Sequence, residues 1–210
     1  MTEREWLEAR LGKFTASNIS LLLEGKRGSA DLFGKKALSY IRKVAGECLT
    51  GGSEPVTSKE MEWGRQYEPL AFDEIRLLYP NAIYYGSFNP VFFPFGEYAG
   101  GSPDGEVDSK IIEIKCPYNT ARHIEHATMT DEEFRDERDD YWTQMQFNMM
   151  CTGYASALFF SYDPRIFDTK KQLIGREFSI DIQFCEALEK RIGLAITELN
   201  KIIDNFLKQN

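Results

Sequence analysis

Apolar residues recur every three or four positions through most of the first eighty residues, which predicts helices there. The expected helices cover about residues 2–11, 17–23, 31–48 and 57–79. Thr2 and Glu5 have the spacing of a capping box at the start of the first helix, and Thr57 and Glu60 repeat that spacing at the start of the last. Pro69 lies inside the last helix and is expected to kink or divide it.

After residue 80 the pattern changes to short runs of β-branched and aromatic residues separated by glycine, proline and aspartate, which predicts strands. The expected strands cover residues 82–85, 91–93, 97–100, 105–107, 111–116, 155–162 and 173–180. A helix is expected at about 131–151, and a long amphipathic helix at 181–207. We expect the apolar stripe of the last helix to pack on the sheet, with a subunit contact as the alternative.

The order of these elements is helices, then a central sheet, then helices, which predicts one α/β domain over residues 1–210. A chain of this length with 42% hydrophobic residues can bury a full core. No run approaches the roughly 20 apolar residues of a membrane span, and the N-terminus lacks a signal-peptide pattern. Four scattered cysteines are typical of reduced thiols. We therefore expect a cytoplasmic protein with no membrane partner.

The formal net charge of −8 argues against a nucleic-acid-binding protein, which usually has a basic face. The charge is unevenly distributed, however. Residues 26–43 form a basic segment, whereas residues 131–140 hold seven acids and two arginines. We interpret the acidic run as a solvated helix face. The basic segment fits a solvated face or a surface that binds an anionic ligand.

One segment predicts a hairpin that gathers charged side chains. Asp104 lies in Gly101-Ser102-Pro103-Asp104-Gly105, and the strand Ile111–Lys115 follows after a turn near Asp108-Ser109. Residues two apart on a strand face the same side, so Glu113 and Lys115 are expected to project together. The adjacent glycines allow close backbone approach to Asp104.

Two carboxylates and backbone carbonyls suit a hard cation such as Mg2+, and a nearby ammonium can position the water that such a cation activates. Phosphodiester hydrolysis needs this combination, because the metal generates the nucleophile and neutralises charge on the phosphate. The pattern therefore predicts a metal-dependent nuclease. An ordinary surface hairpin is the alternative, but unpaired buried charges would be too costly to keep.

Three other sets of polar residues have candidate roles. Glu68 is expected on a helix before the hairpin, where it is either a further metal ligand or a surface charge. Gln144 is expected on the helix after the hairpin, three residues after Tyr141, where it orients the attacking water, contacts a phosphate or lies on the surface. His123 and His126 lack further ligands for zinc, so we interpret them as surface or structural residues.

Five blocks in the same order give the chain a resemblance to the phage lambda exonuclease family, which includes YqaJ-like viral recombinases and alkaline exonucleases. This family is part of the PD-(D/E)xK nuclease superfamily. The blocks are Trp6…Arg10-Leu11-Gly12-Lys13-Phe14-Thr15-Ala16-Ser17, Trp63-Gly64-Arg65-Gln66-Tyr67-Glu68, Ser102-Pro103-Asp104-Gly105, Glu113-Ile114-Lys115-Cys116-Pro117 and Tyr141-x-x-Gln144-x-Gln146, with Tyr162-Asp163-Pro164 after them. The similarity extends over nearly the whole chain.

The resemblance implies a restriction-endonuclease-like core with a central mixed β-sheet flanked by helices. It also implies an Mg2+-dependent exonuclease, with Mn2+ as a substitute, that digests one strand of linear double-stranded DNA from the 5′ end. The 3′ overhang would serve a single-strand annealing protein in phage recombination within the bacterial host cell. Family members form ring-shaped homotrimers around DNA. In such a ring the charge of the channel lining matters more than the net charge of the subunit.

By position, the resemblance assigns Asp104 and Glu113 as metal ligands, together with the backbone carbonyl of Ile114. It assigns Lys115 as the catalytic lysine. Glu68 and Gln144 match accessory residues of the active site, and Glu68 is a candidate ligand as well.

The family's pocket for the terminal 5′ phosphate matches Arg10, Ser17 and Arg27. Arginine grips phosphate oxygens bidentately, and a serine at a helix start adds a hydroxyl beside free N–H groups. Without the resemblance, Arg10 and Ser17 would be interpreted as a helix-end charge and a plain N-cap. Two rival functions stay open: an endonuclease on the same fold, and a non-catalytic scaffold that binds DNA ends.

Overall fold

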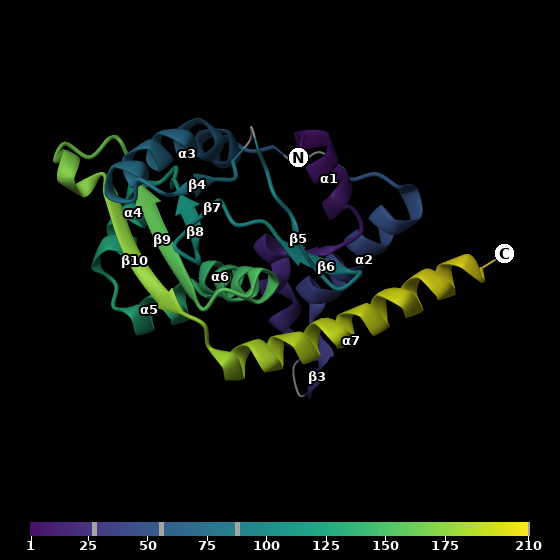
Figure 1. The fold of residues 1–210 in the computed structure, drawn as a ribbon. Coiled ribbons are helices and arrows are strands. Elements are labelled where there is room, and N and C mark those ends of the chain that lie inside the picture. Colours follow the sequence, from purple (N-terminus) through teal and green to yellow (C-terminus); the bar gives the residue numbers. More distant parts are fainter. Residues whose placement is uncertain (27–28, 55–56, 87–88, 210) are drawn as a thin grey trace.

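A five-stranded mixed sheet forms the centre of the molecule (Figure 1). The computed structural model describes residues 1–26, 29–54, 57–86 and 89–209. The strand order is β10-β9-β8-β7-β4, and β8 and β9 are parallel while the other neighbours are antiparallel. The strands are β4 (Ile83–Tyr84), β7 (Gly105–Val107), β8 (Lys110–Lys115), β9 (Ser156–Tyr162) and β10 (Leu173–Ser179).

Helices cover both faces of this sheet. Alternate residues of β8 and β9 point to opposite faces. Ile112 and Phe160 face helix α3 (Lys59–Leu78), and Ile111 and Phe159 face helix α6 (Asp139–Thr152). The expected α/β fold, a central mixed sheet flanked by helices, is confirmed. The strands expected at residues 82–85, 105–107, 111–116, 155–162 and 173–180 all form, with ends shifted by at most one residue.

The N-terminal third packs beside the sheet as a second layer of helices and short strands. It contains α1 (Glu3–Arg10), β1 (Phe14–Thr15), the 3-10 helix η1 (Ala16–Leu23), β2 (Gly25–Lys26), β3 (Ser29–Phe33) and α2 (Lys35–Thr50). β1 pairs with β6 (Ala99–Gly101), which pairs with β5 (Phe93–Phe95) in a three-stranded sheet. β6 ends three residues before Asp104, so its pairing with β1 places the N-terminal region next to the start of the hairpin.

Several expected boundaries of the helices were wrong. Residues 29–33 form a strand, so the helix expected from residue 31 begins at Lys35. The N-cap of α3 is Ser58, whose hydroxyl accepts from the N–H of Met61, rather than Thr57. Helix α3 continues through Pro69 without division. The capping box of Thr2 and Glu5 is confirmed.

The C-terminal half also contains elements that the pattern did not separate. The helix expected at 131–151 is two helices, α5 (Asp131–Glu137) and α6, because Arg138 between them leaves the helical conformation. A helix α4 (Thr120–Thr128) and a 3-10 turn η2 (Thr169–Lys171) were not predicted. No helix among the described residues is long and apolar enough to cross a membrane.

The long C-terminal helix α7 (Ile182–Leu207) forms as expected but packs elsewhere. Its buried stripe contacts α2 and η1 rather than the central sheet, with Leu188 and Ile192 against Ile41 and Leu22 in one hydrophobic cluster. Its C-terminal end extends away from the body of the protein (Figure 1). Helical spacing shows that a face is apolar, but the partner of that face depends on long-range packing.

Candidate active site

The β7–β8 hairpin brings Asp104 to the end of β8, as the sequence predicted. The turn residues Asp108 and Ser109 have φ of 47° and 60°, which reverses the chain within two residues. The Asp104 N–H donates to the Ile112 carbonyl at 3.0 Å, and Asp104 Oδ2 accepts from the Ile114 N–H at 2.7 Å. The Asp104 carboxylate is thus fixed beside the strand that carries the next two charged residues.

Glu113 and Lys115 project from the same face of β8 and contact each other. Lys115 Nζ lies 2.5 Å from Glu113 Oε1, and the Glu113 side chain is fully buried. Gln144 on α6 bridges the pair, since its Nε2 donates to Glu113 Oε1 at 2.5 Å and its Oε1 accepts from Lys115 Nζ at 3.2 Å. The Lys115 ammonium also lies 4.9 Å from the centre of the Tyr141 ring. Gln144 is therefore not a surface residue.

Asn148 is a neighbour of Glu113 that the sequence analysis missed. Its Nδ2 donates to Glu113 Oε2 at 3.2 Å, and its side chain is fully buried. Asn148 lies one helical turn after Gln144, so both side chains face the sheet. This four-residue spacing from Gln144 was the feature of the sequence that could have identified Asn148. Gly101 leaves the room that Asn148 occupies, because a Cβ there would lie 2.2 Å from Asn148 Oδ1.

Glu68 approaches from α3, on the other face of the sheet. Its Oε1 accepts from the Tyr84 hydroxyl at 2.9 Å. A cavity of about 590 Å³ opens here, with Glu68, Ile114, Lys115 and Tyr141 among its lining residues. Burial raises the pKa of Glu68, and the negative charge of Glu113 adds to that rise. Helix α3 therefore presents Glu68 to a cavity whose other wall carries Ile114 and Lys115, the residues that bond to Asp104 and Glu113.

The charges of the site perturb one another. Burial raises the pKa of Asp104 well above its ordinary value, and the charges of Glu113 and Glu68 raise it further. Burial alone would lower the pKa of Lys115, but the carboxylates of Glu113 and Asp104 outweigh it and the net direction is upward. Lys115 is therefore an ammonium ion at neutral pH. Crowded carboxylates of this kind are a mark of functional sites.

The donors at this site fit a hard divalent cation. Within the described part of the chain, no three His, Cys, Asp or Glu side chains stand together in a metal-binding arrangement. Glu113 and Glu68 instead bond to neighbouring side chains. Even so, the candidate ligands are carboxylate oxygens, which a hard cation prefers. A cation would also relieve the repulsion from Glu113 and Glu68 that adds to the raised pKa of Asp104. The Ile112 carbonyl faces β7, so the Ile114 carbonyl, two residues on, faces the same edge, beside Asp104.

A second, basic cavity lies next to the first. Its volume is about 240 Å³, and its lining includes Arg10, Lys13, Lys43 and Arg65. Both cavities share Met61 and Arg65 on α3. The two cavities are therefore adjacent along α3.

The guanidinium of Arg10 is held in place within the basic cavity. It stacks 4.1 Å above the Trp6 ring, and Trp6 Nε1 donates to the Ser102 hydroxyl at 2.9 Å. Ser102 is two residues before Asp104. These contacts connect Arg10 in the basic cavity to the segment that precedes the hairpin. Arg10 is therefore not a solvated charge at a helix end.

The other two residues expected around a terminal phosphate have different outcomes. Ser17 is exposed in η1, and its hydroxyl lies 3.4 Å from the Thr15 hydroxyl and from Asn18 Nδ2. Thr15 and Asn18 both line the basic cavity, so Ser17 lies at its border. The alternative of a plain N-cap does not hold for Ser17, because the N-cap of η1 is Thr15. Arg27 lies outside the described residues.

His123 and His126 are structural, one of the two roles expected for them. Both are buried, and Nδ1 of each lies 2.9 Å from the Ser161 hydroxyl. His123 Nε2 also lies 2.8 Å from the Lys171 carbonyl. The two rings thus join α4 to β9, and neither histidine lines the cavity that contains Lys115.

The mixed sheet between helices, with two acids and a lysine on one hairpin, defines a nuclease. The model of the YqaJ-like viral recombinase domain matches residues 5–155, and the chain belongs to that family. No curated protein matches the chain in sequence.

Solved structures with the same fold are exonucleases. An alkaline exonuclease from Laribacter hongkongensis, LHK-Exo, is 28% identical, with a TM-score of 0.80 over 98% of this chain and 97% of that chain. The complex of LHK-Exo with dAMP is 29% identical, with a TM-score of 0.77 over 97% and 95% of the two chains. A phage-related exonuclease from Haemophilus somnus shares the fold, with 16% identity and a TM-score of 0.72 over 92% and 96%.

Proposed function

We propose that this protein is an Mg2+-dependent exonuclease that degrades one strand of linear double-stranded DNA from its 5′ end. The observation that carries the proposal is the adjacency of the two cavities, which share Met61 and Arg65. The cavity lined by Glu68 and Lys115 suits the scissile phosphate, and the basic cavity with Arg10 suits a terminal phosphate. Neighbouring sites for these two phosphates favour removal of one nucleotide at a time from an end.

The residues that would hold Mg2+ are Asp104, Glu113 and the Ile114 carbonyl, with Glu68 as a further ligand. Mn2+ would substitute, because it accepts the same oxygen donors. When bound, the cation would activate a water molecule and neutralise charge on the scissile phosphate. Asp104 is fixed for this role by the Ile114 N–H, and Glu113 by Gln144 and Asn148.

Lys115 orients the attacking water and stabilises negative charge on the phosphate. The raised pKa of Lys115 favours these roles over that of a general base, because the ammonium keeps its proton at neutral pH. Gln144 holds both Lys115 and Glu113, so it acts through their positions. The water oxygen bonds to phosphorus, the bond to the 3′ oxygen breaks, and that oxygen leaves with a proton.

This bond cleavage leaves the phosphate on the 5′ carbon of the next nucleotide. Arg10, Ser17 and Arg27 would bind that new terminal phosphate, so each product becomes the next substrate. Of the two that the structure describes, Arg10 is better placed than Ser17, since its guanidinium lines the cavity and stacks on Trp6. The complex of LHK-Exo with dAMP supports a mononucleotide as the product class for this chain too.

The proposed biological setting is phage recombination in the cytoplasm of a bacterial host. Degradation of one strand leaves a 3′ single-stranded overhang, which a single-strand annealing protein would take up. We propose that three copies of a single-domain subunit form a ring around the DNA. Such a ring would confine the substrate to a channel, so the net charge of −8 would not prevent binding.

The test is digestion of linear duplex DNA labelled at either end of either strand, with Mg2+ or with EDTA. Substrates with 5′-phosphate and 5′-hydroxyl ends are compared, and a closed circular duplex is the control. Mononucleotides released from phosphorylated 5′ ends, and only with metal, are the expected result. Internal fragments or cutting of the closed circle would indicate an endonuclease, and binding without cleavage would indicate a scaffold.

A further inference from the structure

The segment after β9 contains an ion pair, buried on the aspartate side, that the catalytic site does not use. The Asp163 side chain is fully buried. Arg165 folds back on it with two parallel bonds, Nε to Oδ1 at 2.8 Å and Nη2 to Oδ2 at 2.8 Å. The backbone N–H of Arg165 also donates to Oδ1 at 3.0 Å. This bidentate geometry fixes the plane of the guanidinium.

The same guanidinium holds the loop that follows the catalytic strand. Arg165 Nη1 donates to the Tyr118 carbonyl at 3.0 Å, and Nη2 donates to the Pro117 carbonyl at 3.1 Å. Pro117 and Tyr118 come two and three residues after Lys115, and both line the catalytic cavity. Arg165 therefore fixes the backbone at the point where β8 leaves the sheet.

Arg165 also contacts the helix on the opposite wall of that cavity. Its guanidinium lies 4.3 Å above the ring of Trp63 on α3. Trp63 in turn packs against Tyr67, the neighbour of Glu68, with ring centres 4.1 Å apart. The Tyr118 ring lies edge-on to Trp63 at 5.8 Å. One side chain thus touches both walls that carry catalytic groups.

We infer that Arg165, anchored by Asp163, is a positioning residue of the nuclease site. It sets the distance between Glu68 on α3 and the end of β8 with Glu113 and Lys115. The inference rests on the proposed function for its catalytic consequence. Arg165 does not line the cavity, so it acts through the groups that it holds rather than on the substrate.

The chemistry of the contacts requires arginine. A planar guanidinium can donate to a carboxylate and two carbonyls in its plane while its face stacks on an aromatic ring. A lysine ammonium would keep the charge pair with Asp163 but could not maintain all these contacts. Arg165→Lys therefore keeps the charge and loses the geometry.

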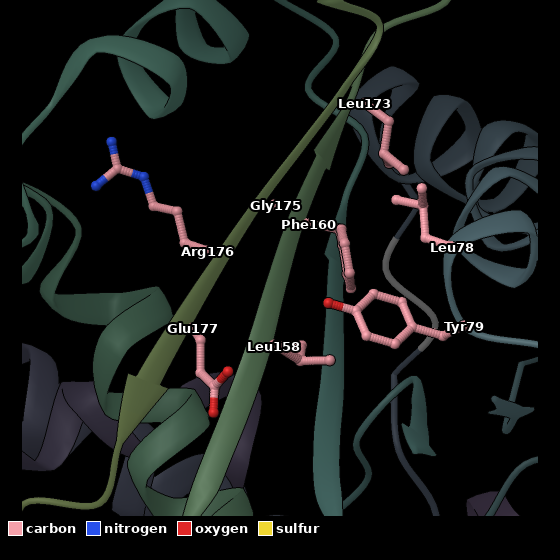
Figure 2. Close-up of a pocket in the computed structure, with 8 residues that line it drawn as sticks. All are labelled: Leu78, Tyr79, Leu158, Phe160, Leu173, Gly175, Arg176 and Glu177. Atoms are coloured by element: carbon pink, nitrogen blue, oxygen red, sulfur yellow. The ribbon is translucent and has the colours of Figure 1, made fainter. Parts of the chain in front are cut away.

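A second arginine provides a matched control. Arg176 on β10 donates to the Asp131 carboxylate at 3.0 Å and to the carbonyls of His126 and Met129, and it lies 5.8 Å from the centre of the Phe134 ring. Its partners are of the same kinds, although its carboxylate partner is exposed, and it lines a different cavity, of about 210 Å³, beside β9 and β10. Figure 2 shows its side chain pointing away from the apolar residues there.

The experiment compares Arg165→Lys with Arg176→Lys in single-turnover digestion, over a range of DNA and Mg2+ concentrations. We expect Arg165→Lys to lower kcat by about tenfold or more, because displacement of catalytic groups by about 1 Å can cost about a hundredfold. The Mg2+ concentration for half-maximal rate should rise. The preference for 5′-phosphate should not change, since Arg10 and the Trp6 ring under it lie on α1 and not on α3. Arg176→Lys should match the wild type.

Two further measurements separate positioning from stability. Hydrogen–deuterium exchange should increase in residues 113–122 and 59–68 of Arg165→Lys, and thermal melting should show that the variant is folded at the assay temperature. Trp63→Leu, which removes the stacked ring and leaves the Asp163 pair intact, should lower kcat in the same direction.

Three results would overturn the inference. These are a normal kcat and Mg2+ dependence in Arg165→Lys, an equal loss in Arg176→Lys, and a loss that matches the unfolded fraction. If the wild type does not cut DNA, the proposed function itself fails. Exchange in residues 113–122 then decides separately whether Arg165 fixes the end of β8, and unchanged exchange would refute that.

Discussion

Lys115 Nζ lies 2.5 Å from Glu113 Oε1 at the catalytic end of β8, while Lys110 at the other end of the strand pairs with Glu177. The first pair is buried on the glutamate side, and the second is exposed to solvent. The same strand thus carries a lysine that the cavity encloses and a lysine that water screens. Only the first can act on a phosphate in the cavity.

Lys115→Ala should abolish cleavage while DNA binding stays largely intact. The variant loses the ammonium that orients water and stabilises charge on the phosphate, an effect worth roughly a thousandfold in rate. Lys110→Ala is the control and should cut at the wild-type rate. Single-turnover digestion and gel-shift binding measure the two properties. Normal turnover by Lys115→Ala would refute the assignment.

Gly101→Ala should impair the site without touching a charged group. The new Cβ would lie 2.2 Å from Asn148 Oδ1, so Asn148 must move away from Glu113. We expect a loss of about 1–3 kcal/mol in the free energy of unfolding. A fall of about tenfold in kcat should accompany it.

The control for this change is Gly46→Ala, which is within helix α2 and meets no atom within 4 Å. It should leave activity unchanged and stabilise the fold by roughly 0.5–1 kcal/mol. Urea unfolding and digestion assays measure both variants. If Gly101→Ala lost stability but kept full kcat, Asn148 would have no part in holding Glu113.

The stability of the fold should decrease as pH falls through the range in which His126 titrates. Burial, then the positive charges of Arg138 and His123, lower the pKa of His126 from 6.5 to about 4. Between these values the unfolded chain binds the proton and the folded chain does not. Neutral His126 therefore makes its full contribution to the free energy of unfolding above about pH 6.5. That contribution, up to about 3 kcal/mol, is lost progressively towards about pH 4.

Urea unfolding of the wild type and of His126→Asn at several pH values isolates this contribution. The asparagine can keep a bond to Ser161 but does not titrate, so its stability should vary less across the window. Carboxylates titrate in both proteins and cancel in the difference. Parallel pH profiles would show that His126 binds its proton equally well in both states.

Arg10→Gln should remove the preference for phosphorylated ends. Arg10 lines the basic cavity, and a charge-assisted bidentate contact with phosphate favours that end by about ten- to a hundredfold. Arg4→Gln on the same helix is the control, because Arg4 is exposed and pairs only with Glu8 in the described structure. Competition between 5′-phosphate and 5′-hydroxyl duplexes measures the preference. A preference retained by Arg10→Gln would place the terminal phosphate elsewhere.

The sequence predicted the hairpin well because its determinants are local. A two-residue period placed Glu113 and Lys115 on one face, and a short turn returned the chain to Asp104. The second neighbours of these residues were harder to predict. Asn148 bonds to Glu113 across 35 residues, and Tyr84 bonds to Glu68 from a two-residue strand. Such contacts depend on the strand order of the sheet, which no local period reveals.

Packing partners were also beyond the reach of local patterns. The apolar stripe of α7 was evident from its spacing, but its contact with α2 and η1 follows from tertiary arrangement. Residues 29–33 pair with β2 in a strand, although their neighbours favour a helix. Tertiary context overrode local preference there. Motif order selected the residues that the hairpin and α6 bring together, and their catalytic roles stay predictions.

Arg65 should bind a phosphate of the substrate, because it lies at the border between the two cavities. It is exposed on α3, one turn before Glu68, and has no ion-pair partner among the described residues. Arg65→Gln should raise the KM for DNA by about tenfold, the effect of losing a charge-assisted contact. The dependence of KM on salt should also become less steep, because one fewer phosphate is neutralised. Arg76→Gln is the control on the same helix, since Arg76 lies over the Phe72 ring and lines neither cavity. An unchanged salt slope in Arg65→Gln would show that the guanidinium stays in solvent while DNA is bound.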